Sequence, residues 1–154
     1  MEQPYKELSR RSMLIAAGAG AAALVMAPRL AMAKPEQVEA ELEKLYGDKP
    51  RNEGKIKLDL PSIAENGQVV PLKFEVESPM TESDHVKAVH IFADGNPNPG
   101  VASFFFTPQM PKAAAQFRLR LAGTQNIVAV AEMADGTLHA AKQEVKVTIG
   151  GCGG

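Results

Sequence analysis

The sequence contains little cysteine and few aromatic residues, and its positive and negative charges nearly cancel. Its 154 residues include one cysteine, no tryptophan and only 5% aromatic residues. A single cysteine excludes an internal disulfide. Lysine and arginine total 17 against 18 aspartates and glutamates, and no basic run occurs. We therefore expect neither nucleic acid nor an anionic membrane as a partner.

The sequence also lacks an apolar run long enough to span a bilayer. The longest, residues 13–27, has about 15 residues, whereas a spanning helix needs roughly 20. Arg10 and Arg11 precede this run, and Ala31 and Ala33 form an A-x-A cleavage site after it. These features predict a twin-arginine signal peptide over residues 1–33 and a protein of the bacterial periplasm. Lys34, not a cysteine, follows the cleavage site, which argues against a lipoprotein.

The twin-arginine route usually carries proteins that fold before export. Its substrates therefore hold a cofactor or assemble with a partner in the cytoplasm. No cofactor-binding motif occurs in this sequence. We accordingly expect no cofactor, and the export signal favours a protein partner.

The remaining chain predicts one all-β domain, residues 34–149, that begins with a short helix. Pro35–Tyr46 has the periodicity of a helix, with Val38, Leu42, Leu45 and Tyr46 on one face and Gly47 as a stop. Alternating or dense apolar residues predict seven strands, near residues 56–60, 70–76, 86–92, 101–106, 116–121, 127–133 and 145–149. Their regular spacing is typical of an immunoglobulin-like antiparallel β-sandwich.

Two strands carry specific expectations. Pro71 lies within the 70–76 run, which suggests an edge strand or a bulge. Phe104, Phe105 and Phe106 are consecutive, so they point to both faces of one strand. Either one of them lies at an interface or the strand is buried on both sides.

The candidate metal ligands and nucleophiles do not form a known pattern. His85, His90, His139, Met133 and Cys152 invite comparison with a copper site, but no histidine or methionine follows the cysteine. A catalytic cysteine needs a neighbouring base, cation or helix N-terminus to lower its pKa, and the residues beside Cys152 are all glycine. We therefore expect no metal site and no catalytic residue.

The C-terminal segment, residues 150–154, predicts a flexible arm. Cys152 stands between Gly150 and Gly151 on one side and Gly153 and Gly154 on the other. Glycine has the widest backbone freedom and no side chain, and five extended residues span about 16–18 Å. Such an arm can carry a thiol into the active site of another protein. The thiol is then acted upon by other enzymes, and this chain is not an enzyme by itself.

Other interpretations of the tail fit the sequence less well. A prenylation motif needs three residues after the cysteine, and two are present. Sulfur carriers of the ubiquitin-like type also end in diglycine, but they act in the cytoplasm, against the export signal. A disordered terminus would leave a free thiol exposed to an oxidising compartment. A structural module that dimerises through a Cys152 disulfide and an enzyme that uses Cys152 as its own nucleophile remain as rivals.

Several segments together resemble SoxY, the sulfur-carrier family of periplasmic thiosulfate oxidation. The tail Val147–Gly154 is the most specific of them. The twin-arginine leader and the following segments extend the resemblance over the whole mature chain: Ile63–Gly67, Ser78–Met80, Ala93–Pro97, Arg118–Ala122 and Val130–Met133.

The resemblance implies a non-catalytic carrier with several partners. Its stable partner would be a small β-sandwich subunit like SoxZ. Sulfur intermediates would be attached to Cys152 by a c-type cytochrome that couples thiosulfate to the thiol. A hydrolase would then release sulfate and leave a persulfide, which in some organisms a sulfane dehydrogenase oxidises further. Asp94–Gly100 and Ser78–Met80 are expected to shape loops without contacting substrate.

Overall fold

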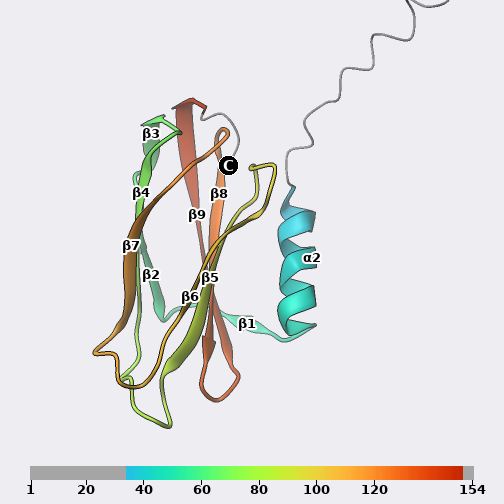
Figure 1. Ribbon diagram of the computed structural model, residues 1–154. Helices are drawn as coiled ribbons and strands as arrows, with labels where there is room; N and C mark the ends of the chain where they lie inside the picture. The colour runs from blue at the N-terminus through green and yellow to red at the C-terminus, as the bar shows by residue number, and fades with distance from the viewer. Residues whose placement is uncertain (1–33, 151–154) are drawn as a thin grey trace, which may run out of the picture. The chain divides into compact units, whose positions relative to one another are not determined.

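The computed structural model describes residues 34–150 and shows two packed β-sheets (Figure 1). The larger sheet has the order β1 (Arg51–Asn52), β9 (Leu138–Ile149), β8 (Gln125–Met133), β5 (Val86–Ala93) and β6 (Gly100–Phe105), and β3 (Ile63–Asn66) also pairs with β9. The smaller sheet has the order β2 (Ile56–Asp59), β4 (Val70–Val76) and β7 (Ala113–Leu119). The predicted all-β sandwich is confirmed.

The strands differ from the sequence prediction in number, direction and length. The described residues form nine strands, two more than predicted. β1 has only two residues, and β3 (Ile-Ala-Glu-Asn) shows no apolar alternation. Both pair in parallel with β9, so the sandwich is not wholly antiparallel. β7 begins at Ala113 and β9 at Leu138, earlier than predicted. Runs of alanine in both strands conceal the alternation that marks the rest.

The helix α2 spans Pro35–Tyr46, as predicted, and packs on the outer face of the larger sheet (Figure 1). Gly47 ends it with a φ of 64°, a conformation that favours glycine. Val38 and Leu42 are buried against Phe92 and Val130 of the sheet. Leu45, predicted on the same face, is instead half exposed and does not belong to this cluster. Within residues 34–150, no helix is long and apolar enough to cross a membrane.

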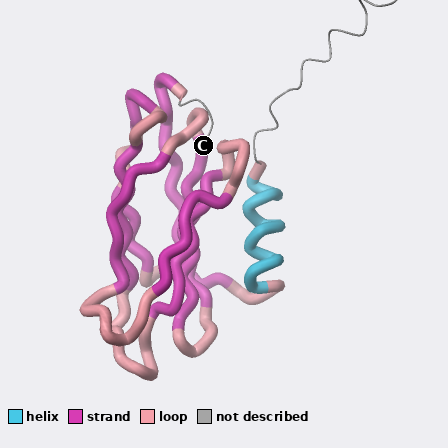
Figure 2. The backbone as a smooth tube through the Cα atoms, viewed as in Figure 1, coloured by secondary structure: helices cyan, strands magenta, loops and turns pink. Residues whose placement is uncertain are grey.

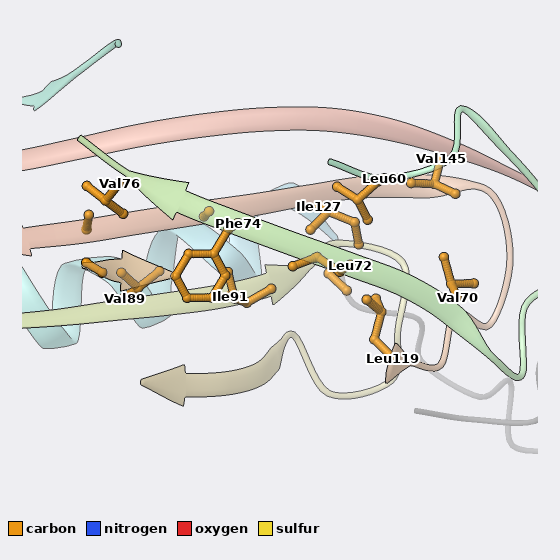
Figure 3. Close-up of a cluster of buried hydrophobic side chains, with 14 of the residues drawn as sticks. Leu60, Val70, Leu72, Phe74, Val76, Val89, Ile91, Leu119, Ile127 and Val145 are labelled. Carbon is orange, nitrogen blue, oxygen red and sulfur yellow. The ribbon is translucent and has the colours of Figure 1, made fainter. Parts of the chain in front are cut away.

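The main core lies between the two sheets (Figure 3). Leu72, Phe74 and Val76 of β4 point into it, while Lys73 and Glu75 point outward. Burying a side chain of this size contributes about 1.5–3 kcal/mol. The core therefore holds the sandwich together in a chain whose single cysteine allows no internal disulfide.

The strand containing Pro71 is not an edge strand. β4 lies between β2 and β7, and its register with β7 runs without a bulge through Pro71 and Arg118. β2, however, ends at Asp59, opposite Lys73. No β2 residue lies opposite Pro71, so the missing N–H group of proline removes no hydrogen bond to β2. The bulge prediction was therefore wrong. The edge prediction holds only locally, because β4 is an interior strand that is paired on one side alone at Pro71.

The three consecutive phenylalanines divide between the two faces of the sheet. Phe104 and Phe106 pack edge-on against Phe74, with ring centroids 5.2 and 6.3 Å apart. Phe105 points outward and is 72% exposed. The interpretation of a strand buried on both faces is therefore wrong in the chain as described.

Candidate functional site at the base of the C-terminal arm

Most of the residues that the sequence singles out lie outside the described part of the chain. These are Gly151, Cys152, Gly153 and Gly154 of the arm and Arg10, Arg11, Ala31 and Ala33 of the leader. Their roles stay predictions. Gly150 is described and is exposed. The structure therefore shows the base of the arm and how the domain holds it.

The end of β9 is bonded to two loops at once. The Gly67 N–H donates to the Ile149 carbonyl at 2.8 Å, and the Leu121 N–H donates to the Gly67 carbonyl at 2.7 Å. The Val147 N–H donates to the Thr124 hydroxyl oxygen at 2.9 Å. These bonds join the turn before β4 and the loop between β7 and β8 to the last residues of β9. Figure 2 shows these loops gathered at one end of the sandwich.

Gly150 lies directly against the β7–β8 loop. A Cβ atom placed on Gly150 would collide with the carbonyl oxygen of Ala122. That neighbour is backbone and cannot rotate away as a side chain could. Glycine is therefore required at position 150 for space.

Asn96 fixes the loop that Gly150 touches. Its Nδ2 donates to the Arg120 carbonyl at 2.8 Å, and its Oδ1 accepts from the Ala122 N–H at 2.9 Å. The same Oδ1 accepts from Gln125 Nε2 at 3.0 Å. One amide side chain thus holds the backbone on both sides of Leu121.

Gln125 and Asp94 extend the same network. Gln125 Nε2 also donates to the Gly123 carbonyl at 3.1 Å, and Gln125 Oε1 accepts from the Gly95 N–H at 2.7 Å. The two carboxylate oxygens of Asp94 accept from the backbone N–H and the side-chain Nδ2 of Asn126, both at 2.8 Å. The β5–β6 and β7–β8 loops are therefore joined by side-chain bonds between residues distant in sequence.

The buried polar residues of the described chain all belong to this network. Asp94, Asn96 and Gln125 are 7%, 2% and 5% exposed, and no other polar or charged residue within 34–150 is buried to this degree. Burying a polar side chain costs free energy unless its hydrogen bonds are made. Here each of the three makes at least two bonds. The sandwich concentrates its buried polarity where the arm begins.

Segments that the sequence singled out converge at this point. Gly67 ends the segment Ile63–Gly67, Ala122 ends Arg118–Ala122, and Asn96 lies within Ala93–Pro97. Sequence reasoning gave Asp94–Gly100 a loop-shaping role and did not connect it to the arm. The signal was present in these separate segments, but only the fold shows that they meet.

The histidines do not form a common site in the described chain. Among residues 34–150, no group of three or more His, Cys, Asp or Glu side chains is placed to hold a metal ion. His90 Nδ1 lies 2.7 Å from the Ser103 hydroxyl, and burial lowers its pKa, opposed by the nearby Glu132. Burial also lowers the pKa of His139. Each of these two histidines has its own surroundings in the sheet.

Comparison with known proteins identifies the family. A model of the sulfur oxidation protein SoxY matches residues 42–152, well over half of the chain. The sulfur carrier protein SoxY from Chlorobium limicola f. thiosulfatophilum is 35% identical. The match covers 74% of this chain and 98% of the Chlorobium chain, with a TM-score of 0.63. Comparison with curated proteins found no match.

More distant structures share only the fold. The superoxide reductase (neelaredoxin) from Ignicoccus hospitalis is 19% identical, with a TM-score of 0.55, over 74% of this chain and 92% of its own. A putative superoxide reductase from Thermotoga maritima is 15% identical, with a TM-score of 0.53, over 64% and 87%. The family model and the Chlorobium structure carry the assignment: this chain belongs to the SoxY family of sulfur oxidation proteins.

Proposed function

We propose that this protein is a non-catalytic sulfur carrier of thiosulfate oxidation that holds its cargo on Cys152. The observation that carries the proposal is that the family match extends through the tail and ends at Cys152 itself. The described domain supports it by ordering the chain up to Gly150, two residues before the thiol. Chain geometry limits the distance between the Cα atoms of Gly150 and Cys152 to about 7 Å.

The chemistry on the thiol would proceed in two balanced steps. In the first, the Cys152 thiol and thiosulfate form a sulfur–sulfur bond and lose one proton and two electrons, which a haem-containing c-type cytochrome accepts. In the second, water cleaves the terminal sulfone from the thiosulfonate. Sulfate and one proton leave, and a persulfide remains on Cys152. The chain itself supplies the thiol, and partner enzymes supply every activating group.

The decisive experiment is mass spectrometry of the protein from cells grown on thiosulfate. We expect thiosulfonate or persulfide adducts on Cys152 and none on Cys152→Ser, which should fold normally but abolish thiosulfate-dependent respiration. A matched control, Cys152→Ser combined with Thr137→Cys, keeps one exposed thiol but moves it to the β8–β9 turn, and it should remain unloaded. A protein found only as a reducible dimer would support the disulfide module instead. Thiosulfate turnover by the purified chain alone would support an enzyme.

We also propose a stable partner, a small β-sandwich subunit similar to SoxZ. The predicted twin-arginine leader and the absence of a cofactor motif in the sequence support it. Affinity capture of the tagged full chain from thiosulfate-grown cells should recover such a subunit in equal amount. Recovery of the chain alone would contradict the partnership without bearing on the sulfur chemistry.

The proposed location is the periplasm. Replacement of Arg10 and Arg11 by lysine should leave the protein in the cytoplasm with its leader uncleaved. Cell fractionation and N-terminal sequencing measure both outcomes, and cleavage after Ala33 is expected in the native protein. Export of the double variant at the normal rate would argue against the twin-arginine route.

A further inference from the structure

The base of the arm is held by contacts that the carrier chemistry does not require. Gly67 bonds the carbonyl of Ile149, Thr124 bonds the N–H of Val147, and Gly150 rests on the carbonyl of Ala122. An arm that only had to be flexible would need none of these contacts. An arm that must leave the domain in a defined direction needs a fixed point of attachment.

The surface that Gly150 touches is itself fixed from within the domain. Asn96 bonds the backbone on both sides of Leu121, and Gln125 bonds both Asn96 and Gly123. These side chains are almost completely buried, so their bonds are shielded from competing water. The β7–β8 loop therefore presents its carbonyl groups in one arrangement.

We propose that Gly150 belongs to the fixed domain and not to the moving arm, and that Asn96 and Gln125 are positioning residues that set the direction in which the arm leaves. The inference rests on the proposed carrier function and refines it. The two positioning residues act through the loop at Ala122, which Gly150 contacts. Gly150 is a glycine because a side chain would strike that carbonyl, whereas sequence reasoning assigned it to the arm for flexibility.

A fixed origin at Gly150 shortens the tether. The cysteine Cα then stays within about 7 Å of the Gly150 Cα. An enzyme that loads Cys152 must therefore approach the loops around Gly150, which contain Gly67 and Ala122. Two exposed apolar side chains belong to these segments: Val69, two residues after Gly67, and Ile149, whose carbonyl accepts from the Gly67 N–H.

The test measures the direction of the arm and its loading separately. One nitroxide is attached to Cys152, and a second to Lys73→Cys on the outer face of β4. Gly150→Ala should shift or broaden the distance distribution by several ångströms. Gly123→Ala, in the same loop with open space around its Cβ position, should leave the distribution unchanged. Unfolding temperatures confirm that both variants fold.

Loading is measured in the variants without labels, with the thiosulfate-coupling enzyme and thiosulfate. Loading of Gly150→Ala should fall about ten- to a hundredfold, because small displacements of a reacting group cost this much. Its reaction with a small maleimide should stay at the native rate, since the thiol itself is unchanged. The maleimide rate excludes a change in the reactivity of the thiol, and the unfolding temperature excludes a folding defect.

A second variant keeps the proposal testable if Gly150→Ala does not fold. Thr124→Val removes the exposed hydroxyl that holds Val147 and should broaden the distance distribution to a smaller degree. Unchanged distances in the folded variants would overturn the fixed origin at Gly150, and shifted distances with native loading would overturn the claim that the direction of the arm matters for loading. Failure of the native protein to load would contradict the carrier function, while the distances would still decide where the fixed domain ends.

Discussion

Two turns at opposite ends of the sandwich have similar sequences and different physical roles. Asp94-Gly95-Asn96 follows β5 and lies beside the arm base, and Asp135-Gly136-Thr137 joins β8 to β9 at the far end (Figure 1). The Asp-Gly pair in each segment predicts a turn from the sequence. In the structure, the first is buried and bonded to residues 24 to 32 positions away.

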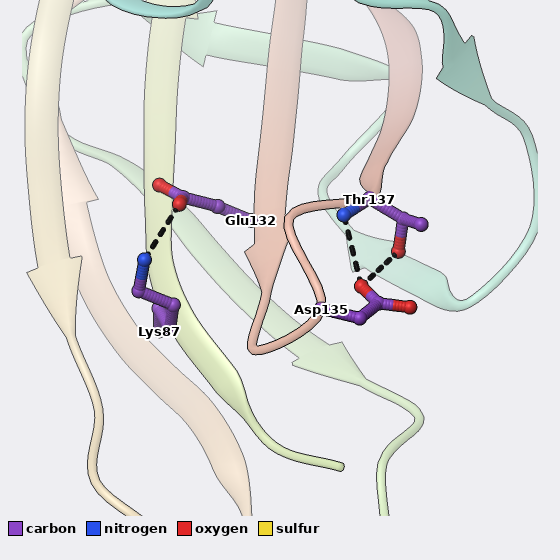
Figure 4. Close-up of polar contacts among 4 residues, drawn as sticks. All are labelled: Lys87, Glu132, Asp135 and Thr137. Carbon is purple, nitrogen blue, oxygen red and sulfur yellow. Dashed lines mark hydrogen bonds and ion pairs between the residues drawn. The ribbon is translucent and has the colours of Figure 1, made fainter. Parts of the chain in front are cut away.

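The far turn is self-contained. Asp135 Oδ1 accepts from the N–H and the hydroxyl of Thr137, at 2.9 and 2.7 Å, and Figure 4 shows both bonds at the surface beside the Lys87–Glu132 ion pair. Every bond of the aspartate stays within the turn. The comparison shows that an Asp-Gly turn in the sequence does not reveal whether it merely reverses the chain or joins distant loops.

The largest expected difference between the turns is in stability. Asn96→Ala should cost roughly 2–4 kcal/mol, because three partners in a nearly dry environment lose a hydrogen bond at once. Thr137→Ala should change the free energy of unfolding by no more than about 0.5 kcal/mol, as surface substitutions usually do. Urea denaturation of both variants measures the contrast. Similar losses at the two turns would show that burial does not distinguish them.

The two turn glycines should respond differently to the same substitutions. Gly136 has a φ of 82°, whereas a Cβ on Gly95 would lie 2.8 Å from Gln125 Cβ. Gly136→Ala should cost about 1–2 kcal/mol for its left-handed backbone. Gly136→Asn should recover most of that loss, because asparagine tolerates this conformation.

Gly95 is constrained by space and not by its φ. Gly95→Ala should cost about 1–3 kcal/mol for overpacking, and Gly95→Asn should be no better than alanine because it is larger. Thermal and urea unfolding of the four variants compares the two glycines. Recovery by asparagine at position 95 would contradict the steric reason.

The smallest expected effect is on the charge of the exposed turn. The N–H of Thr137, and then its hydroxyl, hold the pKa of Asp135 below its ordinary value. An acid with a depressed folded-state pKa stabilises the fold above its unfolded-state pKa, and that contribution is lost as the pH falls through the depressed value. Thr137→Val should raise the Asp135 pKa part of the way to normal. NMR titration of the carboxyl carbon measures this, and an unchanged pKa would show that the hydroxyl plays no part.

Local sequence signals predicted the elements that depend on local interactions. The helix Pro35–Tyr46 followed from its periodicity and from Gly47, and β4 followed from its alternation. β1 and β3 could not be predicted, since β1 has two residues, β3 lacks apolar alternation, and their partner β9 lies far along the chain. The exposure of Leu45 and the interior place of β4 could not be predicted either, because both depend on which elements pack alongside.

The candidate site likewise combines features that the sequence predicts with features that only the fold reveals. The sequence by itself determined the helix, most strands and the glycine-flanked Cys152, because periodicity and composition act over a few residues. Only the tertiary structure decided that Gly67, Asn96, Ala122 and Gly150 meet, and that Gly150 is glycine for space. The physical reason is that burial and hydrogen bonds between distant loops exist only after the sheets have packed.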